Sequence, residues 1–194
     1  MPTGVRLART SDVDHIAAVQ VHTWERLYGP LLRAAGVAVD AAALAEQWGS
    51  AILQPPHHHA RVLVATSDEQ IVGFAAIGPS FDPDLGQDYG EIHALTVHPD
   101  RLHCGHGSRL MAACVDHLQS FGYRWLTTWT LLDDEPRRAF WQSAGWQPDS
   151  ARRVLANHDS FGPEPSGTVT EIRLAVALVD DMNADEVDPD DVRM

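Results

Sequence analysis

One stretch of the chain, residues 90–111, constrains the fold more than any other. It reads GEIHALTVHPDRLHCGHGSRLM. Its first part has the apolar and β-branched residues of a strand, Pro99 ends that strand, and Gly105 and Gly107 come just before an amphipathic run. A strand, a glycine-bearing loop and a helix in this order expose backbone N–H groups at the positive end of a helix dipole. The junction therefore predicts an anion-binding loop, with phosphate as the natural ligand.

The spelling of this loop excludes two other phosphate sites. A dinucleotide-binding loop needs G-x-G-x-x-G with a later acidic residue, and a P-loop needs glycine and lysine followed by serine or threonine. Neither pattern occurs at Gly105 and Gly107. Because G-x-G is also ordinary turn chemistry, the pair by itself leaves a plain turn as the alternative.

The composition predicts one domain with an acidic tail. A chain of 194 residues with 44% hydrophobic content can bury one core, which we expect within residues 1–178. Residues 179–194 hold seven acids against one arginine, a pattern typical of a disordered tail. The net charge of −13 argues against nucleic acid as a partner, because phosphates need a basic surface, and mildly favours a cationic substrate.

Cysteine usage and hydropathy predict a cytoplasmic protein. Cys104 and Cys114 are the only cysteines, and they fit free thiols in a reducing compartment better than a disulfide framework. No apolar run approaches the roughly 20 residues that a bilayer span needs, and the N-terminal stretch lacks the apolar region of a signal peptide. We therefore expect a soluble protein with no membrane partner.

Hydrophobic periodicity predicts a mixed α/β order of elements. The first helix is expected to begin at a capping box of Ser11 and Asp14 and to stop at Gly29-Pro30. The strand, helix and strand around the glycine loop require a parallel pair with a right-handed crossover. The expected strands are 4–8, 61–66, 70–78, 90–97, 124–131, 152–157 and 169–177, and the expected helices are 11–29, 40–53, 106–121 and 133–144.

Taken whole, the glycine stretch resembles motif A of the GNAT superfamily, the acetyl-CoA-dependent N-acyltransferases. Val97, Pro99, Gly105 and Gly107 fall on the family pattern, whereas Leu102 stands where a basic or amide residue is usual, with Arg101 one position earlier. Two other segments are similar to the family. Residues 17–32 look like its Trp-x-x-x-Tyr helix, and residues 134–146 resemble its N-x-x-x-x-x-F-Y-x-x-x-G-F segment.

The resemblance implies the GNAT fold, which is α/β (α+β mixed). Its central mixed, twisted sheet has about six to seven strands flanked by about four helices, with splayed central parallel strands. It also implies acetyl-CoA as cosubstrate, with no metal expected, and a main-chain donor to the acetyl oxygen near Leu95. The residues that it assigns to the cosubstrate are Leu95, Thr96, Val97, Leu102, His103, Cys104, Gly105, His106, Gly107, Ser108 and Asp134.

An amine acceptor must lose a proton before it attacks a thioester, because its pKa lies near ~10.4. The resemblance points to Glu91 as the base, and strand alternation places Glu91, His93, Leu95 and Val97 on one face. His93 is thus a second candidate base. The plainer alternative is that Glu91 is an exposed strand end and that His93 is a half-buried structural histidine.

The departing CoA thiolate must collect a proton, and family members often use a tyrosine where this chain has Trp141. An indole is no practical acid, so unassisted departure, Ser143 or Tyr123, and loss of efficient catalysis all stay open. The sequence therefore predicts an N-acetyltransferase that acts by direct ternary-complex attack. The alternative is a catalytically silent acyl-CoA-binding or regulatory module on the same fold.

The acceptor is expected to be a primary amine, either of a small molecule or of a peptide or protein. Trp24 and Tyr28 are candidates to line its cleft, although aromatics at helical spacing are more often core. Homodimers are common among similar proteins. A metal alternative rests on residue types typical of zinc sites, but their spacing matches no finger or metalloprotease. The residues concerned are His93, His98, His103, Cys104 and His106, with His57, His58 and His59 elsewhere.

Overall fold

The computed structural model describes residues 3–34, 38–157 and 167–178. The predicted acidic tail at 179–194 lies outside the described residues, as does part of the linker between the first two helices. Within the described ranges, no helix combines the length and the apolar character that a bilayer crossing requires.

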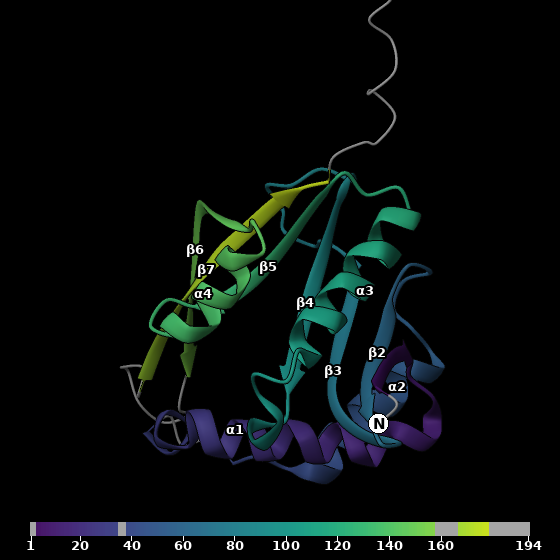
Figure 1. The fold of residues 1–194 in the computed structure, drawn as a ribbon. Helices are drawn as coiled ribbons and strands as arrows, with labels where there is room; N and C mark the ends of the chain where they lie inside the picture. Colours follow the sequence, from purple (N-terminus) through teal and green to yellow (C-terminus); the bar gives the residue numbers. More distant parts are fainter. Residues whose placement is uncertain (1–2, 35–37, 158–166, 179–194) are drawn as a thin grey trace, which may run out of the picture.

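One twisted sheet of seven strands organises the fold, in the order β1-β2-β3-β4-β5-β7-β6 (Figure 1). Only β4 and β5 pair in parallel, as the strand–helix–strand unit predicted, and every other neighbouring pair is antiparallel. The strands are β1 (Thr3–Leu7), β2 (Arg61–Ser67), β3 (Gln70–Pro79), β4 (Tyr89–Val97), β5 (Trp125–Leu131), β6 (Gln147–Asn157) and β7 (Gly167–Ala177).

In the described part of the chain, four α-helices cover the sheet in two layers. Ile16 and Val19 of α1 pack with Phe74 on one face, where α2 adds Trp48, while Leu110 of α3 and Trp141 of α4 belong to the core on the other face. Two 3-10 turns, Thr10–Asp12 and Pro99–Arg101, precede α1 and the glycine loop. The helices are α1 (Val13–Ala34), α2 (Ala41–Leu53), α3 (His106–Ser120) and α4 (Glu135–Ser143).

The first helix differs from the prediction at both ends. Its start is fixed by Asp12, whose carboxylate accepts the backbone N–H of Arg9 at 2.7 Å, so the predicted Ser11/Asp14 capping box is wrong. Its end lies beyond Pro30, whose fixed φ is helical and whose exposed ring costs α1 one backbone hydrogen bond and crowds the preceding turn without ending the helix. The predicted stop at Gly29-Pro30 is therefore also wrong.

The two parallel strands part after a short pairing. Register runs from Tyr89 opposite Trp125 to Glu91 opposite Thr127. One residue further, the hydroxyl of Thr128 donates to the carbonyl of Ile92 at 2.9 Å. Figure 1 shows β4 and β5 diverging from there toward α1. The last backbone pairing therefore lies at Glu91, and the region between the two strands beyond it, where they splay apart, is called the opening below.

A β-bulge in β4 changes which groups face that opening. Ala76 of β3 lies opposite Ala94 and Ile77 lies opposite Ile92, so His93 is an extra residue without a partner in the ladder. One extra residue shifts the alternation of a strand by one position. Leu95 accordingly packs with Ile92 in the core beneath α3. The prediction that Leu95 and Val97 share a face with Glu91 and His93 is therefore wrong.

Candidate active site

The loop between β4 and α3 has the geometry of an anion cradle. His103 and Gly105 have positive φ of 59° and 77°, and Gly105 is the N-cap residue of α3. No side chain caps this helix. The N–H groups of its first turn, at residues 106–108, therefore point out of the helix at the positive end of its dipole. The predicted loop and its glycines are where the sequence placed them.

Arg109 supplies the positive charge that the loop lacks at Leu102, whose side chain is 41% exposed. The guanidinium of Arg109 donates to the carbonyl of Cys104 at 3.1 Å and lies 3.1 Å from Nδ1 of His106. Burial, with the charge of Arg109 next, lowers the pKa of His106, so its imidazole is neutral and can accept that hydrogen bond. The available sequence signal was an arginine four residues after Gly105.

The main chain of β4 turns toward the opening at the residues that the sequence indicated. The carbonyl of Leu95 accepts a 2.6 Å hydrogen bond from Nη2 of Arg137, which reaches across from α4. Because backbone groups alternate along a strand, the main chain of Val97 turns the same way and that of Thr96 turns the other way. The bulge determines which residues these are, because with unbroken alternation the main chain of Ala94 and Thr96 would face the opening instead.

A small polar cluster joins α1 to α4 across the open end. The hydroxyl of Tyr28 donates to Asp134 at 2.8 Å, and Asp134 also caps α4 by accepting the backbone N–H of Arg137 at 3.1 Å. Burial raises the pKa of Tyr28, so its phenol stays protonated near neutral pH. Trp24 is half-buried on α1, one turn before Tyr28. Arg137 is the member of this cluster that the sequence did not single out for the site.

Glu91 and His93 form a hydrogen-bonded pair at the closed end of the opening. Oε1 of Glu91 lies 3.1 Å from Nδ1 of His93, and Oε2 accepts from the hydroxyl of Ser80 at 2.9 Å. Glu91 is 7% exposed, which rules out the alternative of an exposed strand end. Burial acts to raise the pKa of Glu91, but hydrogen bonds from His93 and Ser80 and positive charge nearby outweigh it, and the pKa is lowered.

This pairing assigns the protons. An ionised carboxylate can only accept hydrogen bonds, so Nδ1 of His93 carries a proton, and the lone pair of the neutral ring lies at Nε2. Nε2 makes no hydrogen bond to any residue that the structure describes. The imidazole stacks on Phe81, with ring centroids 5.9 Å apart. His93 is therefore an oriented and accessible base, whereas both oxygens of Glu91 are already engaged.

The loop at residues 80–88 is fastened by a buried arginine. Arg173 of β7 is 4% exposed and donates to Asp82 at 3.0 Å, to Asp84 at 2.6 Å and to Asp149 at 2.6 Å. Hydrogen bonding to Asp84 is the largest of the effects that raise the pKa of Arg173. The indole of Trp129 also donates to Asp82 at 3.0 Å. This anchoring holds Ser80 and Phe81 against the pair of acid and imidazole.

Trp141 is a core residue. It is 1% exposed, and its ring meets the ring of Trp146 edge-on at 4.9 Å. Ser143 is exposed and donates to the carbonyl of Phe140, while the Tyr123 hydroxyl lies 3.1 Å from Nδ1 of His59. Neither of the two candidate proton donors, Ser143 and Tyr123, is paired with a residue of the opening.

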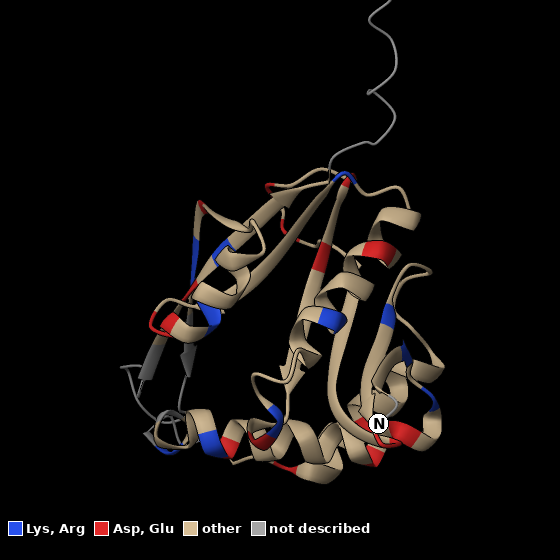
Figure 2. Ribbon diagram, viewed as in Figure 1, with Lys and Arg blue, Asp and Glu red and all other residues tan. Residues whose placement is uncertain are grey.

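Two clusters in the described ranges bring three potential metal ligands together. One is His57, His58 and His59, and the other is His22, His98 and Asp100. The histidines of the glycine stretch do not gather with Cys104 into a ligand set there. Figure 2 shows the basic residues of the described ranges scattered among acidic ones, without one continuous basic stripe.

Comparison with known proteins defines the class to which this fold and site belong. The model of the acetyltransferase (GNAT) family matches residues 20–146. The chain therefore belongs to the GNAT family, whose members are acyltransferase enzymes. It is similar to the uncharacterized N-acetyltransferase YuaI of Bacillus subtilis (strain 168), with 26% identity over 141 residues, which cover 72% of this chain and 77% of YuaI.

Solved structures agree on the fold. An N-acetyltransferase from Staphylococcus aureus Mu50 superposes with a TM-score of 0.68 at 13% identity, covering 91% of this chain and 99% of its own. YncA from Salmonella typhimurium, solved with its cofactor acetyl-CoA, gives a TM-score of 0.64 at 17% identity and covers 95% of this chain and 98% of its own. The predicted GNAT fold, with its mixed sheet and four helices, is confirmed.

Proposed function

We propose that this chain transfers an acetyl group from acetyl-CoA to a primary amine by direct attack within a ternary complex. The observation that carries the proposal is the arrangement of the opening. It runs from an uncapped, glycine-bearing helix start at its wide end to the hydrogen-bonded Glu91–His93 pair at its closed end. One end suits a pyrophosphate, and the other suits the transfer of a proton.

The residues present fit the proposed cosubstrate. The backbone of residues 103–108, with Arg109 beside it, would hold the pyrophosphate, because left-handed Gly105 leaves the first-turn N–H groups uncovered. The main chain of Leu95 and Val97 would bind the pantetheine arm along β4, with Thr96 between them and Asp134 across the opening. Bound there, acetyl-CoA supplies an activated thioester carbonyl.

His93 takes the proton of the attacking amine. Its Nε2 is free and its Nδ1 is held by Glu91, so the ring presents a lone pair in one orientation. Glu91 is the positioning residue, since a carboxylate with a lowered pKa is a weak base. The negative charge that develops on the thioester oxygen would be met by a main-chain N–H of β4 near the bulge, around Leu95.

Direct attack is favoured over an acyl-cysteine route. Cys114 is buried in the core beneath α3, and burial raises the pKa of its thiol to about 12. Cys104 is exposed, and its thiol donates to the carbonyl of Leu102 within the loop assigned to the pyrophosphate. Since Trp141 is no acid, the thiolate departs without a dedicated donor, which a thiol pKa near ~8.5 permits.

The acceptor side lies on the face of α1 and α2. Glu91 and His93 project toward this face, and Trp24 and Tyr28 of α1 approach the wide end of the opening. We propose a small amine or a peptide amine as the partner, a cytoplasmic location, and no requirement for metal. Two copies of the chain would form a homodimer.

The test combines binding with turnover. Titration calorimetry with acetyl-CoA measures donor binding, and thiol release measures transfer to a panel of amines. The sequence has 14 arginines and no lysine, so lysine self-acetylation contributes no background. Binding with turnover, and initial-rate lines that intersect, support the proposal. Binding without turnover on any amine would favour the silent acyl-CoA-binding module, and parallel rate lines would exclude a ternary complex.

A further inference from the structure

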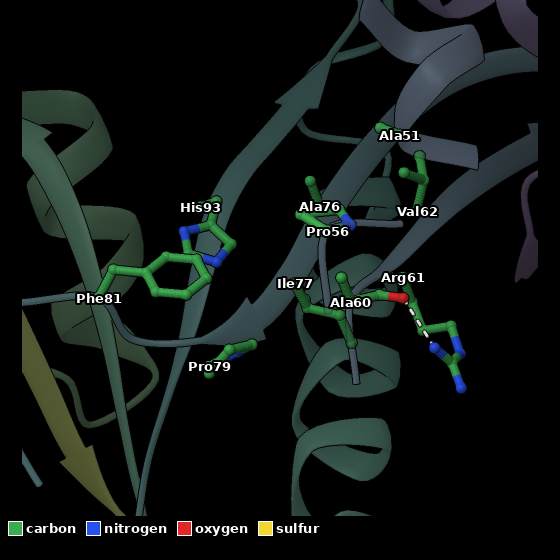
Figure 3. A pocket seen from close by; sticks show the side chains of 10 residues that line it. All are labelled: Ala51, Pro56, Ala60, Arg61, Val62, Ala76, Ile77, Pro79, Phe81 and His93. Atoms are coloured by element: carbon green, nitrogen blue, oxygen red, sulfur yellow. Dashed lines mark hydrogen bonds between the residues drawn. The ribbon is translucent and has the colours of Figure 1, made fainter. Parts of the chain in front are cut away.

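The residue assigned as base also lines a pocket outside the opening. This pocket of about 260 Å³ lies on the α2 side of the sheet, between the end of α2, the loop before β2, and β3 (Figure 3). Figure 3 shows the rings of His93 and Phe81 side by side along one wall. Its lining residues are Ala51, Pro56, Ala60, Arg61, Val62, Ala76, Ile77, Pro79, Phe81 and His93.

Nε2 of His93 lies beside β3, the strand that forms the pocket floor. A Cβ placed on Gly78 would lie 3.3 Å from Nε2, so the absence of a side chain there leaves room beside that nitrogen. Oε1 of Glu91 holds the opposite nitrogen at 3.1 Å. An amine that sits over β3 can therefore reach the proton-accepting atom while the rest of it lies in the pocket.

The lining offers no counter-charge for a second cation. Arg61 is the one charged lining residue, and its Nη1 donates to the carbonyls of His58 and Ala60, both at 2.7 Å. Its guanidinium lies 5.2 Å from the ring of Phe121, and Figure 3 shows it directed away from His93. The carboxylate paired with His93, that of Glu91, is buried and engaged by two partners. Apolar groups form the remaining wall.

From this arrangement we infer that the acceptor is a small primary amine with a compact apolar body, bound with its nitrogen at His93 and its carbon chain along β3 and Phe81. The inference rests on the proposed function and names its substrate class. It narrows the expectation of a cationic substrate drawn from the net charge of −13, because an alkylamine brings one positive charge and the pocket lining has no carboxylate for a second. Diamines and lysine-bearing peptides are the disfavoured acceptors.

The first test measures kcat/KM for linear alkylamines from propylamine to hexylamine, with 1,6-diaminohexane as the charged match to hexylamine. Each added methylene should raise kcat/KM about fourfold until the pocket is filled, which corresponds to ~0.8 kcal/mol for each buried CH₂. The diamine should lose the gain of the longer chain. A flat chain-length series, or a diamine or lysine peptide that equals hexylamine, would overturn the inference.

Filling variants check where the chain binds. Ala76→Leu on β3 and Ala60→Leu in the loop before β2 should each abolish the preference for hexylamine over propylamine. Ala112→Leu makes the same change on the exposed surface of α3 and should preserve the preference. An unchanged preference in both filling variants would place the carbon chain elsewhere and refute the proposed pocket.

A binding measurement separates this inference from the proposed function. Three alanines line the pocket, so methyl resonances of Ala51, Ala60 and Ala76 report occupancy without any chemistry. Hexylamine should shift them, and 1,6-diaminohexane should not. Methyl shifts without turnover would support the proposed amine pocket and contradict the acetyltransfer proposal. Turnover of hexylamine without methyl shifts would refute the proposed amine pocket and still support acetyltransfer.

Discussion

Replacing His93 and Glu91 one at a time and together shows which of them is the base. His93→Phe keeps a ring that can stack on Phe81 and removes both ring nitrogens. Glu91→Gln keeps the shape, because the amide oxygen still accepts from Nδ1 of His93 and the amide nitrogen can donate to Ser80, but it removes the charge. The two variants therefore separate proton transfer from positioning.

The expected losses differ in size. A positioned general base contributes roughly 10²–10⁴-fold to rate, so His93→Phe should lower kcat/KM by that factor. A hydrogen bond to a charged group contributes about 1 kcal/mol more than one between neutral groups, so Glu91→Gln should cost about fivefold. The double variant should be no slower than His93→Phe alone, because Glu91 acts through the imidazole.

The assay is thiol release with a saturating donor and one small amine, repeated across pH. Calorimetry with acetyl-CoA on each variant controls for donor binding, which neither change should alter. A larger loss for Glu91→Gln than for His93→Phe would refute the assignment and make the carboxylate the base. Additive losses in the double variant would show that the two residues act separately, which contradicts the hydrogen-bonded pair.

Three further predictions concern the cradle, the sheet and the start of α1. Gly105→Glu should weaken acetyl-CoA binding at least tenfold in titration calorimetry. The control is Gly122→Glu, at a glycine with a similar φ of +88° and nothing within 4 Å of its Cβ, and it should leave binding intact. Gly73→Ala should lower the free energy of unfolding by about 1–3 kcal/mol, because its Cβ would lie 2.7 Å from a backbone oxygen of β4. Gly49→Ala, in a helix and with nothing within 4 Å of its Cβ, should raise the free energy of unfolding by up to ~1 kcal/mol. Equal urea midpoints for the two variants would contradict this prediction. Hydrogen bonding to Arg6 lowers the pKa of Asp12, so the stability that Asp12 contributes is full above the unfolded value near ~3.9 and is lost as pH falls through the folded value. Asp12→Asn should lower the free energy of unfolding by about 1 kcal/mol at pH 7, and its urea midpoint should approach that of wild type as pH falls below the unfolded value.

Local signals in the sequence predicted most helices and strands and the glycine loop before α3. The left-handed Gly105 and the cap that Asp40 gives α2 follow from local signals, because each feature depends only on neighbours within a few residues. The continuation of α1 through Pro30 was not predictable in this way. A proline predicts a helix end from local chemistry alone, whereas here the backbone angle is tolerated and a single hydrogen bond is lost.

The parts of the site that sequence reasoning missed depend on contacts between distant residues. Arg137 reaches Leu95 over 42 positions, and Arg173 reaches Asp84 over 89. No periodicity or motif carries such pairings. The pairing of Glu91 with His93 was predicted, because strand alternation placed them together. The opposite orientation of Leu95 was missed, because a bulge leaves no mark in composition.

The bulge at His93 makes the alternation of side chains and main-chain groups differ between the two parts of β4. Before it, the side chain of Glu91 serves the acceptor face, and after it the main chain of Leu95 serves the opening between β4 and β5. Deleting His93 would restore an unbroken ladder with β3, because Ile92 and Ala94 already lie opposite the adjacent residues Ile77 and Ala76, and every position downstream would keep its present face. The residue that the bulge inserts is thus the proposed base itself, and a single-codon deletion at His93 would remove the imidazole while leaving the pairing of β3 with β4 intact.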